Sequence, residues 1–210
     1  MQIDCFVVGA YETNCYILRK DRNAKDCLII DTGLNAAKII DFINQHKLNP
    51  VAVVLTHGHI DHIAGLAALL EKFPDTKVYI HKLDAEALTG GKNNLSDMIG
   101  GTFSVRPADF IIKDGDTIEQ AGVNLKVIHT PGHTPGGICL YAKDDGIIFV
   151  GDTLFAGSVG RTDFPGGSMT KLLQGIREKL LTLPDDTIVY PGHGPQTSIA
   201  EEKKDNSFLR

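Results

Sequence analysis

The chain has 210 residues, of which 42% are hydrophobic and 22% charged, a composition typical of a globular protein with a sizeable core. Its formal net charge of −5 provides no basic field, so we expect no nucleic-acid partner. No apolar run approaches the roughly 20 residues that span a bilayer, and the N-terminus has an early acid and no basic region, so we expect no membrane anchor and no signal peptide. These features predict a cytoplasmic protein that forms one domain over residues 1–210.

The four cysteines (Cys5, Cys15, Cys27 and Cys139) are widely spaced and include no C-x-x-C pair. A disulfide framework is not expected at this length and density, and the spacing of a thiolate zinc site is missing. We interpret these residues as small apolar side chains in or near strands. Any metal ion must therefore be held by nitrogen and oxygen ligands.

The first half of the chain alternates strand-like and helix-like patterns. Residues 35–46 place apolar side chains on one face of a helix, for which Asn35 is suited as the N-cap. A second helix is expected over residues 63–70. Short apolar runs bounded by turn residues predict strands at 3–8, 14–18, 27–31, 51–55 and 77–80.

The second half continues the alternation after a glycine- and asparagine-rich stretch at 88–104, which we expect to be a mobile loop over a site. An amphipathic pattern predicts a helix over 168–183. Strands are expected at 124–128, 137–141, 146–150 and 187–190. The alternation indicates an α/β or mixed class in which helices pack outside sheets.

Residues 56–62 carry the strongest chemical signal, since they read Thr-His-Gly-His-Ile-Asp-His. An H-x-H-x-D-H pattern arises by chance in about one sequence in a thousand of this composition. It follows a buried strand and precedes a helix. His57 and His59, two apart on an irregular turn, can point to one centre, while Asp61 and His62 project from the start of the helix towards a second centre nearby.

Three further fragments place a histidine or aspartate directly after an apolar strand and a small residue: His133, Asp152 and His193. Functional groups gather at the carboxyl ends of strands in open sheets. Four such ends supply five imidazoles and two carboxylates, a donor set that suits two divalent ions. The remaining histidines, His46, His81 and His129, are expected to be structural or solvent-facing.

These motifs resemble those of the metallo-β-lactamase superfamily, with T-P-G-H-T-P-G at 130–136, G-D-T-L-F at 151–155 and P-G-H-G-P at 191–195. The segment G-S-V-G-R-T-D at 157–163 is similar to that of single-domain glyoxalase II-like (hydroxyacylglutathione hydrolase-like) enzymes. The C-terminal part also echoes that subgroup, although N-S-F stands at 206–208 where N-P-F is common. The resemblance covers nearly the whole chain.

The resemblance implies an αββα sandwich, that is, two face-to-face β-sheets with helices on the outer faces and a site on one edge. It implies that one metal ion is held by His57, His59 and His133, that a second is held by Asp61, His62 and His193, and that Asp152 bridges both. Asp31 matches a superfamily position that supports the site. Zinc is the expected metal, and iron or manganese also suits this donor set.

The expected reaction is attack of a metal-bridging hydroxide on the carbonyl of an anionic glutathione-type thioester such as S-lactoylglutathione. Asp61 is expected to be both ligand and orienter or proton acceptor of the nucleophile. Arg161 matches a family position near the glutathione carboxylate and is the expected substrate anchor. Only 17 residues follow His193, so we expect no C-terminal helical domain. A homodimer would be unsurprising.

Other functions remain open on the same fold. A persulfide dioxygenase-like enzyme would use one iron on two histidines and one aspartate. A lactone or β-lactam hydrolase would use the same centre on a cyclic carbonyl, and the negative charge disfavours a tRNA-processing nuclease. The intact set of Asp61, His62 and His193 favours the binuclear hydrolase.

Overall fold

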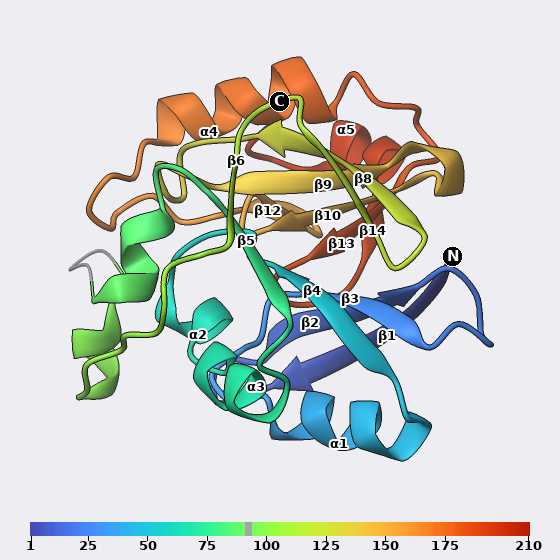
Figure 1. Cartoon of the computed structure of the whole chain (residues 1–210). Coiled ribbons are helices and arrows are strands. Elements are labelled where there is room, and N and C mark those ends of the chain that lie inside the picture. Colours follow the sequence, from blue (N-terminus) through green and yellow to red (C-terminus); the bar gives the residue numbers. More distant parts are fainter. Residues whose placement is uncertain (91–93) are drawn as a thin grey trace.

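The computed structural model describes residues 1–90 and 94–210 and contains two six-stranded sheets between outer helices (Figure 1). The first sheet has its strands in chain order. Its first three strands are antiparallel, and the third to sixth run parallel to one another. The strands are β1 (Gln2–Val8), β2 (Thr13–Arg19), β3 (Asp26–Ile30), β4 (Asn49–Val54), β5 (Lys77–His81) and β6 (Phe110–Ile112).

The second sheet has the order β14-β13-β10-β9-β8-β7. Both β8 and β10 are antiparallel to β9, and β13 is parallel to β10, so β8, β10 and β13 end at the same edge. The strands are β7 (Thr117–Gln120), β8 (Val123–His129), β9 (Ile138–Ala142), β10 (Ile147–Gly151), β13 (Ile188–Pro191) and β14 (Thr197–Ser198). A small hairpin of β11 (Leu154–Phe155) and β12 (Ser158–Val159) follows β10 in the chain.

Alternation along the central strands divides the core into layers. In β2, Cys15 and Ile17 face the outer helices, whereas Tyr16 and Leu18 face the second sheet. Side chains alternate in this way because successive residues of a strand point to opposite faces. The apolar layer between the sheets includes Phe149, whose ring centroid is 5.0 Å from that of Tyr16. Two cores outside the sheets complete the αββα order.

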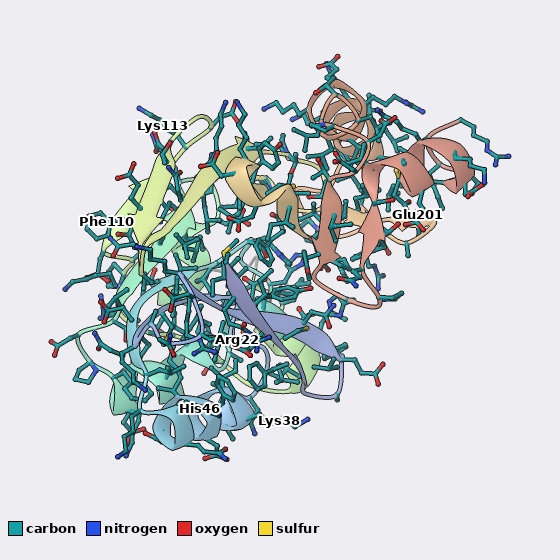
Figure 2. The ribbon with its side chains drawn as sticks, turned by 90° about the vertical axis from the view of Figure 1, so that its right-hand side faces the viewer. Arg22, Lys38, His46, Phe110, Lys113 and Glu201 are labelled. Carbon is teal, nitrogen blue, oxygen red and sulfur yellow. The ribbon has the colours of Figure 1, made fainter. Side chains whose placement is uncertain are left out.

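The outer layers are short helices. The first sheet is covered by α1 (Ala37–His46), α2 (Ile60–Ile63) and α3 (Leu66–Lys72), and the second by α4 (Met169–Gly175), the π-helical turn η5 (Ile176–Leu180) and α5 (Ile199–Asp205). Figure 2 shows Lys38 on α1 and Glu201 on α5 at opposite outer faces. The predicted αββα sandwich is confirmed.

The expected helix over 63–70 is wrong in its bounds. The chain is helical from Ile60 to Ile63 and again from Leu66, because the Gly65 amide donates to the Gly33 carbonyl (2.8 Å) instead of within the helix. Glycine is required there, since a Cβ would collide with the Thr32 carbonyl oxygen. The N-cap expectation is also corrected by one residue. Ala36 occupies the cap position, and the Asn35 side chain accepts a hydrogen bond from the Ala37 amide (2.8 Å).

The helix expected over 168–183 begins as predicted, with the Ser168 side chain accepting from the Lys171 amide, but changes to a π-helical turn after Gly175. Sequence patterns missed the short strands β6, β7 and β14 and the helix α5. None of the helices within residues 1–90 and 94–210 has the length and apolar character needed to span a bilayer. All four cysteines are free thiols, and Cys5 is the exposed one.

The stretch 88–104 is less loop-like than expected. It contains the end of a 3-10 helix, η1 (Ala85–Thr89), and a second one, η3 (Ser96–Ile99), and anchors itself in the outer core through Leu88 and Phe103. Residues 91–93 of this stretch lie outside the described residues. Its position over a site is confirmed, because Leu95 and Met98 line the cavity described next.

Candidate metal centre

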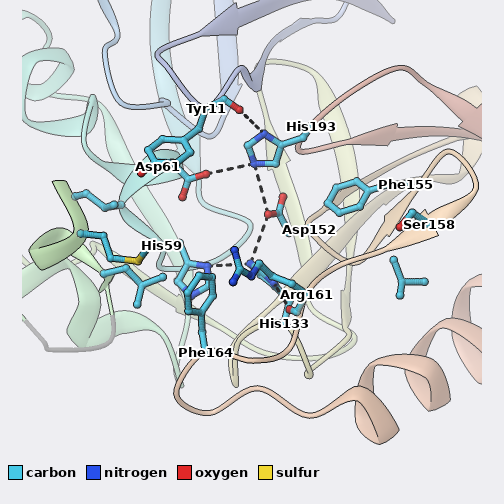
Figure 3. A pocket seen from close by; sticks show the side chains of 14 residues that line it. Tyr11, His59, Asp61, His133, Asp152, Phe155, Ser158, Arg161, Phe164 and His193 are labelled. Atoms are coloured by element: carbon cyan, nitrogen blue, oxygen red, sulfur yellow. Dashed lines mark hydrogen bonds and ion pairs between the residues drawn. The ribbon is translucent and has the colours of Figure 1, made fainter. Parts of the chain in front are cut away.

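The seven predicted donor side chains come together at one edge of the sandwich. Figure 3 shows His59, Asp61, His133, Asp152 and His193. The loop after β4 and the first turn of α2 supply four of them from the first sheet. The second sheet supplies the other three, one from the carboxyl end of each of the parallel-running strands β8, β10 and β13. The donors are His57, His59, Asp61, His62, His133, Asp152 and His193.

His57, His59 and His133 form the first donor group, with ligand atoms within 4.8 Å of one another. His59 Nδ1 is 2.8 Å from His133 Nε2. All three side chains are buried. Two ring nitrogens therefore face each other at hydrogen-bond distance inside the protein.

Asp61, His62 and His193 form the second donor group, also within 4.8 Å of one another. His62 Nε2 and His193 Nε2 are 3.2 Å apart, and Asp61 Oδ2 is 3.3 Å from His193 Nε2. Here one carboxylate and two imidazoles converge on the same point.

Asp152 lies between the two donor groups. Its Oδ1 is 3.3 Å from His62 Nε2, and its Oδ2 is 3.5 Å from both His133 Nε2 and His193 Nε2. The carboxylate thus contacts one histidine of the first donor group and two of the second. This is the position expected for a bridging ligand.

The far nitrogen of four histidines is held by an acceptor. His57 Nδ1 is 3.1 Å from Thr56 Oγ1, His62 Nδ1 is 2.8 Å from Asp31 Oδ2, His133 Nδ1 is 2.7 Å from the Arg161 carbonyl and His193 Nδ1 is 2.9 Å from the Tyr11 carbonyl. Thr56 Oγ1 donates to Asp31 and so accepts from His57. A neutral imidazole that donates from Nδ1 presents a lone pair at Nε2.

Two buried polar atoms in the centre, His57 Nε2 and Asp152 Oδ1, have no hydrogen-bond partner among the described residues. Buried polar groups are normally paired, and unpaired lone pairs that face one another repel. A divalent cation would satisfy these atoms and the converging Nε2 lone pairs together. Nitrogen and carboxylate donors in this number fit such an ion.

The two donor groups differ in their proton affinity. Burial, together with the neighbouring histidines, lowers the pKa of His57 well below its usual value and that of His59 to about 3. Burial also disfavours the charged form of His193, but hydrogen bonds to Asp152 and Asp61 raise its pKa to about 9. Asp152, Asp31 and Asp61 likewise outweigh burial and raise the pKa of His62.

Glycine permits the close packing around the bridging carboxylate. A Cβ on Gly192 would collide with Asp152 Oδ1 and lie 2.8 Å from His62 Cε1. Gly151 has a φ of +48°, and a Cβ there would lie 2.6 Å from Thr56 Oγ1. The glycines before Asp152 and His193 are therefore required by the approach of backbone to the centre.

The centre opens into a cavity of about 490 Å³. Its wall is mostly apolar and aromatic and includes the partly exposed Tyr11 and Met98, and a volume of this size suits a small-molecule ligand. Figure 3 shows the donors His59, Asp61, Asp152 and His193 among the lining side chains.

Arg161, the predicted substrate anchor, lines this cavity, but its guanidinium already has partners. It forms two hydrogen bonds with Asp163 (2.8 and 2.7 Å) and lies 4.1 Å from the centroid of the Phe164 ring. No sequence pattern predicted the Asp163 pair or the contact by which the Arg161 carbonyl orients His133.

The other histidines lie outside both donor groups. His46 is exposed at the end of α1. The rings of His81 and His129 stack with centroids 4.1 Å apart, and burial together with His129 lowers the pKa of His81 to about 4.

Sequence reasoning missed one buried acid beside the centre, Asp84, which accepts hydrogen bonds from both loops of the first donor group. The available signal was its place just beyond the carboxyl end of β5, a strand parallel to β4.

The fold and this donor centre define the class of protein, a metal-binding αββα sandwich. A protein-family model described as the metallo-beta-lactamase superfamily matches residues 8–193. The chain belongs to the metallo-β-lactamase superfamily.

Two relatives cover nearly all of the chain. The probable metallo-hydrolase YqgX of Bacillus subtilis (strain 168) is 40% identical over 96% of this chain and 94% of its own length. The hydroxyacylglutathione hydrolase GloC of Haemophilus influenzae is 35% identical over 100% of this chain and 98% of its own length. The superfamily and these relatives indicate a metal-dependent hydrolase.

Two solved structures share the whole architecture. The BLEG-1 B3 metallo-beta-lactamase matches with a TM-score of 0.93 and 36% identity, covering 99% of each chain. TTHA1623 in a di-iron-bound form matches with a TM-score of 0.86 and 33% identity, covering 98% of this chain and 100% of the other. A protein similar to this chain thus holds two metal ions.

Proposed function

We propose that this chain is a binuclear metal-dependent hydrolase that cleaves an anionic thioester of the glutathione type. The observation that carries the proposal is the pair of donor groups that share the Asp152 carboxylate. One ion would be held by His57, His59 and His133, the other by Asp61, His62 and His193, and Asp152 would bridge them. Zinc is the proposed metal, and the di-iron form of TTHA1623 supports iron as the alternative.

When bound, two divalent ions supply Lewis acidity and lower the pKa of water from about 15.7 to about 7, which provides a nucleophile at neutral pH. Asp61 lines the cavity beside His193. Burial opposes its ionisation, but His62 and His193 lower the pKa of Asp61 overall, so it is charged at neutral pH. Its carboxylate can therefore orient the nucleophile or accept its proton.

The similarity to GloC supports a glutathione thioester as substrate. A thiolate leaves without protonation by a strong acid, so the chain needs no further acid at the leaving group. Arg161 is the proposed anchor for a substrate carboxylate, and that carboxylate must compete with Asp163 for the guanidinium. A homodimer and a cytoplasmic location stay predictions.

The test is metal analysis of the purified chain combined with turnover of S-D-lactoylglutathione before and after chelation. We expect two metal ions per chain and an activity that the chelator removes and added zinc or iron restores. A metal-loaded chain that leaves this thioester intact would refute the substrate. One iron per chain with sulfite formed from a persulfide would instead establish the dioxygenase alternative.

A second candidate is hydrolysis of a cyclic amide or ester, because the BLEG-1 structure described as a B3 metallo-beta-lactamase shares 36% identity and the full fold. The same metal-loaded chain should be assayed with a chromogenic cephalosporin and a simple lactone. Our proposal requires the kcat/KM for the thioester to exceed both values.

A further inference from the structure

Asp84 is a buried aspartate that is not among the seven donors. It lies three residues after β5 and is 6% exposed. Because β5 runs parallel to β4, its carboxyl end lies at the same edge of the sheet as the loop that carries His57 and His59. A charged group buried at this edge requires partners.

Both oxygens of Asp84 accept hydrogen bonds from the loops of the first donor group. Oδ2 accepts from the Gly58 amide (3.0 Å) and from Thr134 Oγ1 (2.7 Å), and Oδ1 accepts from the Gly136 amide (2.7 Å). Gly58 separates the first two histidines of the motif, and Thr134 directly follows His133. One carboxylate therefore connects a loop of the first sheet with a loop of the second.

The Asp84 side chain does not cap the 3-10 helix η1 that follows it. Asp84 occupies the N-cap position of η1, where an aspartate commonly accepts from the following amides, but it makes no such bond. The two loops also pack tightly on this segment. A Cβ on Gly136 would lie 2.6 Å from Asp84 Oδ1, and a Cβ on Gly58 would lie 2.6 Å from Ala87 Cβ.

The second donor group is held by a different carboxylate. Asp31 Oδ2 contacts His62 Nδ1 at 2.8 Å, and Asp31 Oδ1 accepts from the Thr56 amide at 2.8 Å. Asp84 makes no hydrogen bond to any residue of the second donor group within the described chain. Asp31 also reaches the first group, since Thr56 Oγ1 donates to Asp31 and accepts from His57, so only Asp84 is confined to the loops of one group.

We propose that Asp84 is a positioning residue that acts selectively on the first donor group. By connecting Gly58 with Thr134 and Gly136, it sets the separation of His59 Nδ1 and His133 Nε2, and with it the affinity of that group for a metal ion. The inference rests on the proposed function only in that the seven donors bind metal.

The experiment measures zinc affinity of the full-length chain by competition with a chelator, in two backgrounds. His193→Ala leaves the first donor group complete, and His133→Ala leaves the second complete. Adding Asp84→Asn should weaken zinc binding about 10–100-fold in the His193→Ala background, as is typical when a partner of a ligand is lost. In the His133→Ala background the change should stay below about twofold.

The matched control is Asp109→Asn, which alters a carboxylate that also accepts a backbone amide, Val78 N at 2.8 Å, but lies beside no donor. It should leave zinc affinity unchanged in both backgrounds. Equal weakening by Asp84→Asn in both backgrounds would reduce Asp84 to a general structural role. Unchanged affinity in the His193→Ala background would exclude the positioning role altogether.

A milder pair of variants keeps the test decisive if Asp84→Asn does not fold. Thr134→Val removes one of the three hydrogen bonds that Asp84 accepts, and Thr134→Ser retains the hydroxyl that donates it. The valine variant should weaken zinc binding several-fold in the His193→Ala background, and the serine variant should restore it. Equal affinities of the two would contradict the proposal.

These affinities are measured without substrate, so the two proposals fail separately. A chain that shows the expected zinc pattern but no thioesterase activity would leave the role of Asp84 intact and refute the proposed substrate. A chain with thioesterase activity whose zinc affinities do not change in Asp84→Asn would support the proposed substrate and refute the role of Asp84. A chain that binds no divalent ion would overturn both.

Discussion

The two donor groups differ in how far they are open to solvent. The histidines of the first group are at most 5% exposed, whereas the side chains of Asp61 and His193 in the second are 18% and 26% exposed. The first group contains imidazoles alone, and the second includes a carboxylate at the cavity wall. The comparison separates a buried group suited to hold an ion from an open group suited to meet a substrate.

The two donor groups also differ in the protonation of their histidines. In the metal-free chain, burial and mutual repulsion keep His57 and His59 neutral at pH 7, because both pKa values are lowered. Neighbouring carboxylates, against the effect of burial, keep His62 and His193 protonated by raising their pKa values. The second donor group must therefore release protons before it can bind a metal ion.

The largest effect is expected from the residue that the two groups share. Asp152→Ala removes the carboxylate that contacts His62, His133 and His193. We expect hydrolytic activity to fall by more than the roughly 100-fold loss typical of partners of ligands, and metal content to drop below that of the parent chain. Metal analysis and kcat measurements check this. Two ions retained at full affinity would contradict the bridging role.

The next effect is a difference in pH dependence. Since His193 has a pKa of about 9 in the metal-free chain, the proton on His193 alone should lower the apparent affinity of the second donor group about tenfold per unit as pH drops below that value, and the proton on His62 should add to this fall. The His57 and His59 contribution to the first group should stay flat near neutrality. Calorimetric titration in buffers of different ionisation enthalpy would reveal the protons released at each step. Equal proton release in both steps would contradict the comparison.

The stability of the metal-free chain should change with pH in the opposite direction from metal affinity, because it should fall as the pH rises. A histidine whose folded-state pKa is raised stabilises the fold fully below its unfolded pKa, near 6.5. That contribution is lost as pH rises towards about 9, the folded pKa of His193. Thermal unfolding of the chelated chain should therefore show a lower Tm at pH 9 than at pH 6.5 from this group. His193→Ala is the control, because it removes this part of the dependence.

A smaller effect concerns Arg161, whose carbonyl orients the first donor group while its side chain lines the cavity. Arg161→Ala keeps the carbonyl, so metal content should be unchanged and KM for an anionic thioester should rise up to about fivefold. Asp163→Asn frees the guanidinium and should lower KM. An unchanged KM in Arg161→Ala would refute the anchor.

The smallest effect concerns Tyr11, the corresponding residue for the second donor group. Its carbonyl accepts from His193, and its exposed ring lies at the cavity. Tyr11→Ala should change KM about twofold and leave metal affinity unchanged, since the carbonyl remains. A loss of metal from this variant would show that the ring, rather than the carbonyl, supports His193.

Sequence reasoning singled out seven side chains that the structure brings together, because each follows a local rule. Four of them lie within residues 57–62, between an apolar strand and a helix, and His133, Asp152 and His193 each follow an apolar strand and a glycine. The sequence predicted the central strands for the same reason. Short edge strands such as β6 and β14 were missed, since two or three residues carry no periodicity.

The break at Gly65 and the contacts of Asp84 were missed for a different reason. The helix is interrupted because the Gly65 amide bonds to the Gly33 carbonyl, and the Asp84 oxygens accept from groups 26 to 52 residues away. Arg161 was predicted as a substrate anchor without its pairing with Asp163, which depends on the turn that brings the two side chains together. Such contacts depend on how distant segments pack in the folded chain, and the local sequence pattern does not predict them.

By itself, the sequence determined the donor types, their order and the alternation that produces two sheets between helices. Only the tertiary structure decided which nitrogen of each histidine faces the centre. His62 Nδ1 is held by Asp31, 31 residues away, and His193 Nδ1 by the Tyr11 carbonyl, 182 residues away. The physical reason is that a neutral imidazole offers its lone pair opposite to the nitrogen that donates, and the acceptor comes from a distant part of the chain.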